Sequence, residues 1–393
     1  MIKVDAESFL VITAAALVAA LTVALLPRRI VPPVVVLEVL LGILIGPQVL
    51  GLAQSDQFTD FFGNLGLGML FFFAGYEIDF DRLKGRPLLL AGAGWLLSLA
   101  IAYGVGGALA AAGLVLSLLF TGSALATTAI GTLIPILRDA DELKSKLGTF
   151  LLAAGATGEF GPILLVTLLL SGHAPLHEAA LLVGFTLVAT VLAVLSIRTA
   201  ERGWRLMEEG LETSGQPGVR ILVVLVFGLV ALAASLGLDI LLGGFVAGII
   251  TRAALRGREV EVLESKLTAV GYGFLIPFFF VTSGMAFDLD ALLDSTKALL
   301  LVPMFLALFL LVRGTPAMLL YRGVLEFRER VSLAFFSATA LPLVVAITTL
   351  AVDGGHMRSS TAASLVGAAI LSTLIYPFVG LALRRGATAP APA

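Results

Sequence analysis

The apolar run "LGTFLLAAGATGEFGPILLVTLLLSG", residues 147–172, is long enough to cross a lipid bilayer as a helix. A spanning helix needs about 20 consecutive apolar residues. The run contains a single ionisable residue, Glu159, near its middle, with glycines close by on both sides. A charged side chain at the bilayer centre costs about 2.5–3.5 kcal/mol on insertion scales. We therefore expect Glu159 to have a function that offsets this cost.

The composition of the whole chain agrees with a membrane protein. Of its 393 residues, 59% are hydrophobic and 13% are charged, and the mean hydropathy is +1.06. A net charge of -2 gives no indication of a nucleic-acid partner. The chain has no cysteine, which excludes disulfides and thiolate metal sites. These features predict an all-α polytopic membrane protein without a cofactor, in which the lipid bilayer is the main partner.

Hydrophobic segments of spanning length recur along almost the entire chain. We expect 13 transmembrane helices, with boundaries accurate to a few residues. Their approximate limits are 9–27, 30–52, 58–78, 87–110, 114–137, 147–170, 178–198, 219–236, 239–253, 267–286, 297–321, 331–352 and 359–383.

The positions of Lys and Arg test this count, because cytoplasmic loops carry an excess of both residues. With the N-terminus placed outside, all but four of the 25 basic residues fall in inside loops. The exceptions are Lys3, Lys297 and Arg358 in outside segments, and Arg313 within a span. The sequence therefore predicts a multi-pass protein of the cell (inner) membrane, with its N-terminus outside and its C-terminus cytoplasmic.

Two spans contain similar polar stretches. Residues 123–137 read "SALATTAIGTLIPIL" and residues 337–350 read "SATALPLVVAITTL". Both combine small residues and threonines with an internal proline, Pro135 or Pro342, and the predicted topology gives them opposite orientations. Such pairs indicate inverted repeats with two broken helices, as in secondary transporters, because free backbone groups at membrane depth must line a cavity or bind an ion. The alternative is a pair of packed helices rich in small residues.

The surroundings of Glu159 favour contact with an ion or a proton. Pro162 has no N–H, so the carbonyl one turn earlier, that of Gly158, lacks its helical donor. The loosened backbone allows water or an ion to approach the carboxylate. The alternative is a buried structural carboxylate that is paired with Arg313.

Three other charged residues are expected within spans. Arg313 is too deep to reach the cytoplasmic surface comfortably, so an internal salt bridge with Glu159 or Glu77 is expected. Glu77, at the inner end of its span, is expected to have a structural or gating role or to bind the ion directly. The sequence offers no firm account of Glu38.

Six stretches together resemble the monovalent cation:proton antiporter superfamily, which has the sodium/proton exchanger fold and includes the membrane domain of potassium-efflux antiporters. The resemblance extends over nearly the whole chain. It is carried by "LEVLLGILIGPQVLGL", "GLGMLFFFAGYEID", "ATTAIGTLIPILRD", "GGFVAGII", "PFFFVTSGMAFDL" and "LPLVVAITTL".

The resemblance implies a homodimer and an ion site where the two broken helices cross. It implies a single exchanger domain over residues 1–385, with core helices at about 87–170 and 297–383 and the remaining helices on the dimer side. A disordered tail is expected at 386–393.

The resemblance also implies roles for individual residues. By position, Glu159 matches the essential aspartate of the family, and Thr128, with Thr127 beside it, matches the polar residue in the first broken helix. Arg313 matches the basic residue of the helix before the second broken one. The expected function is exchange of Na⁺ or K⁺ for H⁺, which compete for Glu159. Because one carboxylate stands where many members have two acidic or amide residues, electroneutral exchange is expected.

Several alternatives stay open. A sodium-coupled organic-anion symporter of related fold would need room for its substrate, and no polar or aromatic cluster indicates such a site. A passive channel would need a selectivity filter, which is not visible. An intramembrane enzyme would need a catalytic pair or metal ligands within the spans, and we expect no enzymatic activity. A non-transporting sensor or scaffold relative is the remaining alternative.

Overall fold

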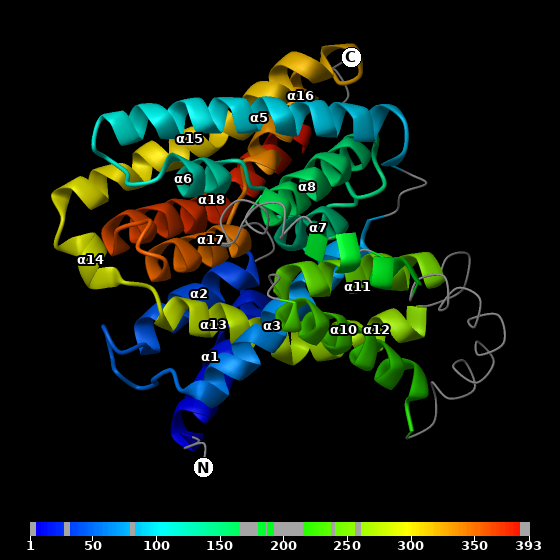
Figure 1. Ribbon diagram of the computed structural model, residues 1–393, viewed down its shortest axis with the longest axis vertical. Coiled ribbons are helices and arrows are strands. Elements are labelled where there is room, and N and C mark those ends of the chain that lie inside the picture. The colour runs from blue at the N-terminus through cyan, green and yellow to red at the C-terminus, as the bar shows by residue number, and fades with distance from the viewer. Residues whose placement is uncertain are drawn as a thin grey trace. The chain divides into compact units, whose positions relative to one another are not determined.

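The structure is a computed structural model (Figure 1) that describes residues 5–26, 32–78, 83–165, 180–181, 183–185, 187–191, 215–236, 240–255 and 261–385. The side chains of residues 135, 139, 240, 261 and 385 are not described. Within these ranges every regular element is a helix, which confirms the predicted all-α class.

Most helices follow the predicted spans to within a few residues, but α2 (Val34–Ile45) ends well before the predicted limit at residue 52. The helices are α1 (Ala6–Leu25), α2 (Val34–Ile45), α3 (Gln57–Tyr76), α5 (Arg86–Ala111), α6 (Leu118–Leu125), α7 (Ile130–Asp139), α8 (Lys146–Leu165), α10 (Pro217–Ser235), α11 (Ile240–Ala254), α12 (Glu261–Val270), α13 (Ile276–Met285), α14 (Leu289–Leu293), α15 (Thr296–Leu320), α16 (Phe327–Ser337), α17 (Pro342–Asp353) and α18 (Ser359–Arg385), with a π-helical turn at Gly271–Leu275 and a 3₁₀ turn at Tyr321–Gly323.

The chain is a multi-pass membrane protein. In the described ranges, nine helices or helix pairs are long and apolar enough to cross a membrane, and three shorter apolar helices accompany them. The predicted span 178–198 and the tail 386–393 lie mostly or entirely outside these ranges. The count of 13 spans and the orientation of the termini therefore stay predictions.

The chain forms two compact units. The first comprises the described residues within 1–18, 44–79 and 167–285. Its α3 packs against α10, α11 and α13. A Cβ on Gly75 would collide with the carbonyl of Phe245, and a Cβ on Gly248 would collide with the carbonyl of Phe72. Glycine therefore allows the backbones of α3 and α11 to touch, as small residues do between membrane helices.

The second unit comprises the described residues within 19–43, 80–166 and 286–393. In it α5 packs along α6, α8 and α15, while α15 and α16 pack against α18 (Figure 1). Two of its membrane segments are interrupted, the first between α6 and α7 and the second between α16 and α17. The predicted broken helices are therefore present at both positions.

The two breaks differ in the position of their proline. Pro342 is the first residue of α17, where the N–H that proline lacks would have no helical acceptor. Pro135 instead lies within α7, after the first break, which covers residues 126–129. The first break is thus not positioned by its proline.

Backbone groups in the breaks are hydrogen-bonded to distant segments. The N–H of Ala129 donates to the carbonyl of Thr339 across the two breaks, at 2.8 Å. The N–H of Ala340 donates to Oγ of Ser372 on α18, at 3.1 Å. These bonds satisfy polar groups that would otherwise be unpaired at membrane depth. The first bond joins the two breaks directly, and the second joins the second break to α18.

Candidate functional site

Thr128, in the first break, is the point where four elements meet. Its N–H donates to the carbonyl of Gly158 on α8, at 3.0 Å. Its hydroxyl donates to the carbonyl of Ser337 at the end of α16 and accepts from Nε of Arg313 on α15. The residue is fully buried. The family resemblance implies that Thr128 lies where the two broken helices cross, and the structure brings it together with Arg313.

The carbonyl of Gly158 is free of its helical donor, as the proline in α8 predicts. Pro162 lies inside α8 and has no N–H to offer that carbonyl. The donor is replaced by the N–H of Thr128. The freed carbonyl therefore anchors the first break to α8. A Cβ on Gly158 would lie 2.9 Å from Oγ1 of Thr128 and would also collide with Nη2 of Arg313, so only glycine allows this approach.

Arg313 is buried and is held by neutral groups. Nε donates to Oγ1 of Thr128 at 2.9 Å, Nη1 donates to Oγ of Ser98 at 3.1 Å, and Nη2 donates to the carbonyl of Ala154 at 3.0 Å. No ion pair joins Arg313 to Glu159, although both residues are described. The expected salt bridge with Glu159 is therefore not present. Glu77, the other expected partner, follows α3 and belongs to the first unit.

Glu159 lies in α8 directly after Gly158, with a side chain that is only 1% exposed. Its Oε2 is buried and has no hydrogen-bond partner among the described residues. Nearly all buried polar atoms in proteins have a partner, so an orphaned carboxylate oxygen requires an explanation. A carboxylate in this state is suited to hold a proton or a cation.

The other predicted residues are less central. Thr127 is buried, and its hydroxyl donates to the carbonyl of Ala124 at 2.8 Å, which closes the end of α6. Glu38 is buried within α2. The side chain of Pro135 is outside the part of the structure that is described.

The structure adds residues that the sequence analysis missed. Ser98 on α5 accepts from Arg313 and donates to the carbonyl of Val312 at 3.0 Å. It is the only serine or threonine of α5, which is a weak signal that could have been noticed. The carbonyls of Ala154 and Ser337 have no sequence signal, because every residue has a carbonyl.

Comparisons with known proteins agree with this fold. The family model described as "Sodium/hydrogen exchanger, transmembrane" matches residues 14–381. The "Putative Na(+)/H(+) antiporter YjbQ" of Bacillus subtilis is 26% identical over 92% of this chain, which spans 61% of the length of that relative. The "Probable Na(+)/H(+) antiporter 3" of Methanocaldococcus jannaschii is 30% identical, over 71% of this chain and 72% of the relative.

A solved structure shows the same fold. The sodium proton antiporter MjNhaP1 from Methanocaldococcus jannaschii, at pH 8, superposes with a TM-score of 0.63 over 96% of both chains, at 17% sequence identity. The family match covers almost all of the chain, and the two broken helices, Glu159 on α8 and Arg313 on α15 lie inside the matched region. The chain belongs to the sodium/hydrogen exchanger family.

Proposed function

We propose that the protein is a secondary active antiporter, and not an enzyme, that exchanges Na⁺ or K⁺ for H⁺ across the cell membrane. The observation that carries this proposal is the buried carboxylate of Glu159, whose Oε2 has no partner among the described residues. A site for exchange must be able to hold either of two positive ions, one at a time. An unpaired carboxylate at membrane depth meets this requirement.

The mechanism that we infer is competition at Glu159. The ionised carboxylate binds a dehydrated cation, and the protonated carboxyl group does not. The hydroxyl of Thr128 can add an oxygen ligand, because donation to Ser337 and acceptance from Arg313 leave one lone pair of Oγ1 unused. Oxygen ligands suit hard cations of this kind.

The charges near Glu159 support electroneutral exchange. Its neighbours in α8, Thr157 and Gly158, are uncharged, and Arg313 is occupied by neutral acceptors. One carboxyl group can hold either one proton or, when it is ionised, one cation. Each cycle then exchanges one cation for one proton and moves no net charge.

Alternating access requires part of the protein to move around the site. We infer that the core helices, within about 87–170 and 297–383, move relative to helices that form a homodimer. The second compact unit contains most of this predicted core, and the division into two units supports the proposal. The excess of Lys and Arg in the predicted inside loops supports an outside N-terminus and a cytoplasmic C-terminus.

Reconstituted protein tests the exchange directly. Proteoliposomes with an internal pH dye and an imposed proton gradient receive Na⁺, K⁺ or Li⁺ in turn. We expect at least one cation to collapse the gradient with wild-type protein and with Glu38→Gln, which changes another buried carboxylate of the same unit. Glu159→Gln should abolish the collapse. Collapse that survives in Glu159→Gln would place the coupling site elsewhere, and no collapse with any cation would favour a symporter or a non-transporting relative.

A further inference from the structure

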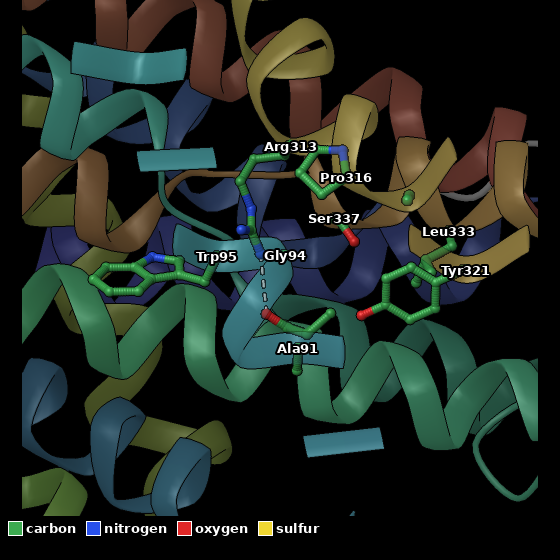
Figure 2. A pocket seen from close by; sticks show the side chains of 10 residues that line it. Ala91, Gly94, Trp95, Arg313, Pro316, Tyr321, Leu333 and Ser337 are labelled. Carbon is green, nitrogen blue, oxygen red and sulfur yellow. Dashed lines mark hydrogen bonds between the residues drawn. The ribbon is translucent and has the colours of Figure 1, made fainter. Parts of the chain in front are cut away.

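A small cavity of about 10 Å³ lies beside the guanidinium of Arg313 in the second unit. Its polar lining comes from Arg313, Tyr321, Ser337 and Trp95, and the rest of the lining consists mainly of small apolar residues. Figure 2 shows the guanidinium and the hydroxyls of Tyr321 and Ser337 around the same space. Polar groups therefore line one part of a cavity whose remaining wall is apolar.

The groups around this cavity have unused hydrogen-bonding capacity. A guanidinium has five N–H groups, and Arg313 uses three of them for Thr128, Ser98 and Ala154. The indole Nε1 of Trp95 is buried and has no acceptor in the part of the chain that the structure describes. Buried donors of this kind are normally satisfied, and a buried charge in particular needs either a partner or hydration.

The volume of the cavity and the polar groups on its wall are suited to one water molecule. A cavity of about 10–15 Å³ is the smallest that holds a water, and a buried water typically makes about three hydrogen bonds. We propose that one water molecule binds in this cavity, accepts a hydrogen bond from Arg313, and links the guanidinium to the hydroxyls of Tyr321 and Ser337.

This water completes the neutral surroundings of Arg313. Its consequence for exchange rests on the proposed function. An arginine that is fully satisfied by neutral groups has no need of Glu159 as a partner, so the carboxylate stays available for the cation or the proton. Without the water, Arg313 attracts Glu159 more strongly and competes with the cation. Tyr321 and Ser337 are therefore positioning residues that act through Arg313.

Gly94 offers a variant that fills the cavity without a clash. A Cβ added there lies 3.5 Å from Cβ of Pro316, 3.9 Å from Cδ1 of Leu320 and 4.0 Å from Cε2 of Tyr321, which are ordinary contacts. Gly94→Ala should therefore displace the water and leave the fold intact. Gly92→Ala is the matched control, because it is in the same helix and its Cβ meets no atom within 4 Å.

Radiolytic hydroxyl-radical labelling with mass spectrometry detects the water in the full-length protein. Bound water should make Tyr321 react faster than Tyr376, which is also buried in the same unit and donates to the carbonyl of Leu306. Gly92→Ala should keep this ratio, and Gly94→Ala should lower Tyr321 to the rate of Tyr376. Equal rates for both tyrosines in the wild type, or an unchanged ratio in Gly94→Ala, would overturn the water site.

Exchange kinetics test the positioning role separately. Gly94→Ala and Tyr321→Phe should raise the apparent KM for the cation roughly tenfold, with the maximal rate little changed. Gly92→Ala and Tyr376→Phe should behave as the wild type. An unchanged KM in Gly94→Ala would contradict the role of the water in exchange. Absence of exchange in the wild type would refute the proposed function, while labelling would still decide whether the water is present.

Discussion

Thr128 links the first break, α8, α15 and α16 through one backbone and two side-chain hydrogen bonds. A single hydroxyl therefore serves as the acceptor for Arg313 and as the donor to the carbonyl of Ser337. Because Thr128 is fully buried, removal of its hydroxyl leaves the Nε–H of Arg313 without this acceptor. The position of this side chain consequently bears on both stability and exchange.

The first prediction concerns this hydroxyl. Thr128→Val keeps the shape of the side chain and removes its oxygen, so we expect a loss of about 1–3 kcal/mol in stability and a strong loss of exchange. Thr128→Ser retains the hydroxyl and should keep most of both. Thermal unfolding in detergent and the proteoliposome assay measure the two effects. A Val variant with wild-type stability and exchange would show that the hydroxyl is not needed.

At the scale of helices, α8 and the first break are connected by a hydrogen bond that exists because of a proline. The sequence alone predicted that Pro162 frees the carbonyl of Gly158, since this follows from a local rule of helix geometry. It did not predict that the N–H of Thr128 would donate to this carbonyl, because that hydrogen bond joins segments that are distant in sequence. The same limit explains why the first break lies at residues 126–129 and not at Pro135, because the N–H groups of Thr128 and Ala129 bond to remote carbonyls.

The second prediction tests this connection. Pro162→Ala restores a helical donor for the carbonyl of Gly158, which then competes with the N–H of Thr128. We expect exchange to fall at least roughly tenfold, because small displacements of a site cost this much or more, while thermal stability is retained. Pro303→Ala, an exposed proline within α15, is the control and should change neither quantity. Full exchange by Pro162→Ala would contradict a role for this bond.

A second set of contacts joins the ends of three elements. Arg384, near the end of α18, donates to both carboxylate oxygens of Glu142 in the loop after α7, at 2.9 and 3.1 Å, and to Glu329 in the first turn of α16, at 2.9 Å. Partial burial on its own raises the pKa of Glu142, but hydrogen bonds from Arg384 and Ser145 outweigh it and bring the pKa below its ordinary value.

The third prediction follows from the lowered pKa of Glu142. A carboxyl group with a lowered pKa in the folded state stabilises the protein above the unfolded pKa, which is about 4.3, and the contribution disappears as pH falls through the folded value. Glu142→Gln should therefore lower stability by about 1 kcal/mol at neutral pH and by nothing once pH is well below 4. Thermal unfolding measured from pH 7 to well below pH 4 follows this difference. Arg384→Gln should show the same convergence, and a difference that is constant with pH would refute the assignment.

At the scale of the whole molecule, hydropathy and charge placed most membrane segments correctly. Each predicted span that the structure describes in full corresponds to a helix, an interrupted helix or two consecutive helices, because burial in lipid demands long apolar runs with satisfied backbones. The candidate site was only partly predictable. Glu159 and Arg313 were identifiable because charges are rare in apolar spans. Ser98, the acceptor carbonyls and the neutral surroundings of Arg313 depend on how the helices pack, which one sequence does not reveal.

The proposed mechanism requires that one proton and one cation exclude each other at Glu159. Exclusive binding at a single site predicts that, on the acidic limb of the profile, the apparent KM for the cation rises about tenfold for each unit by which the pH falls. The maximal rate should not change.

The apparent KM for the cation, measured as a function of pH in proteoliposomes with the wild-type protein, distinguishes one shared site from two separate sites. Competition at Glu159 predicts a slope of about −1 in the logarithm of KM against pH on the acidic limb, with a constant maximal rate. A KM that does not depend on pH, with a maximal rate that does, would show that the proton and the cation bind at different sites and would contradict competition at Glu159.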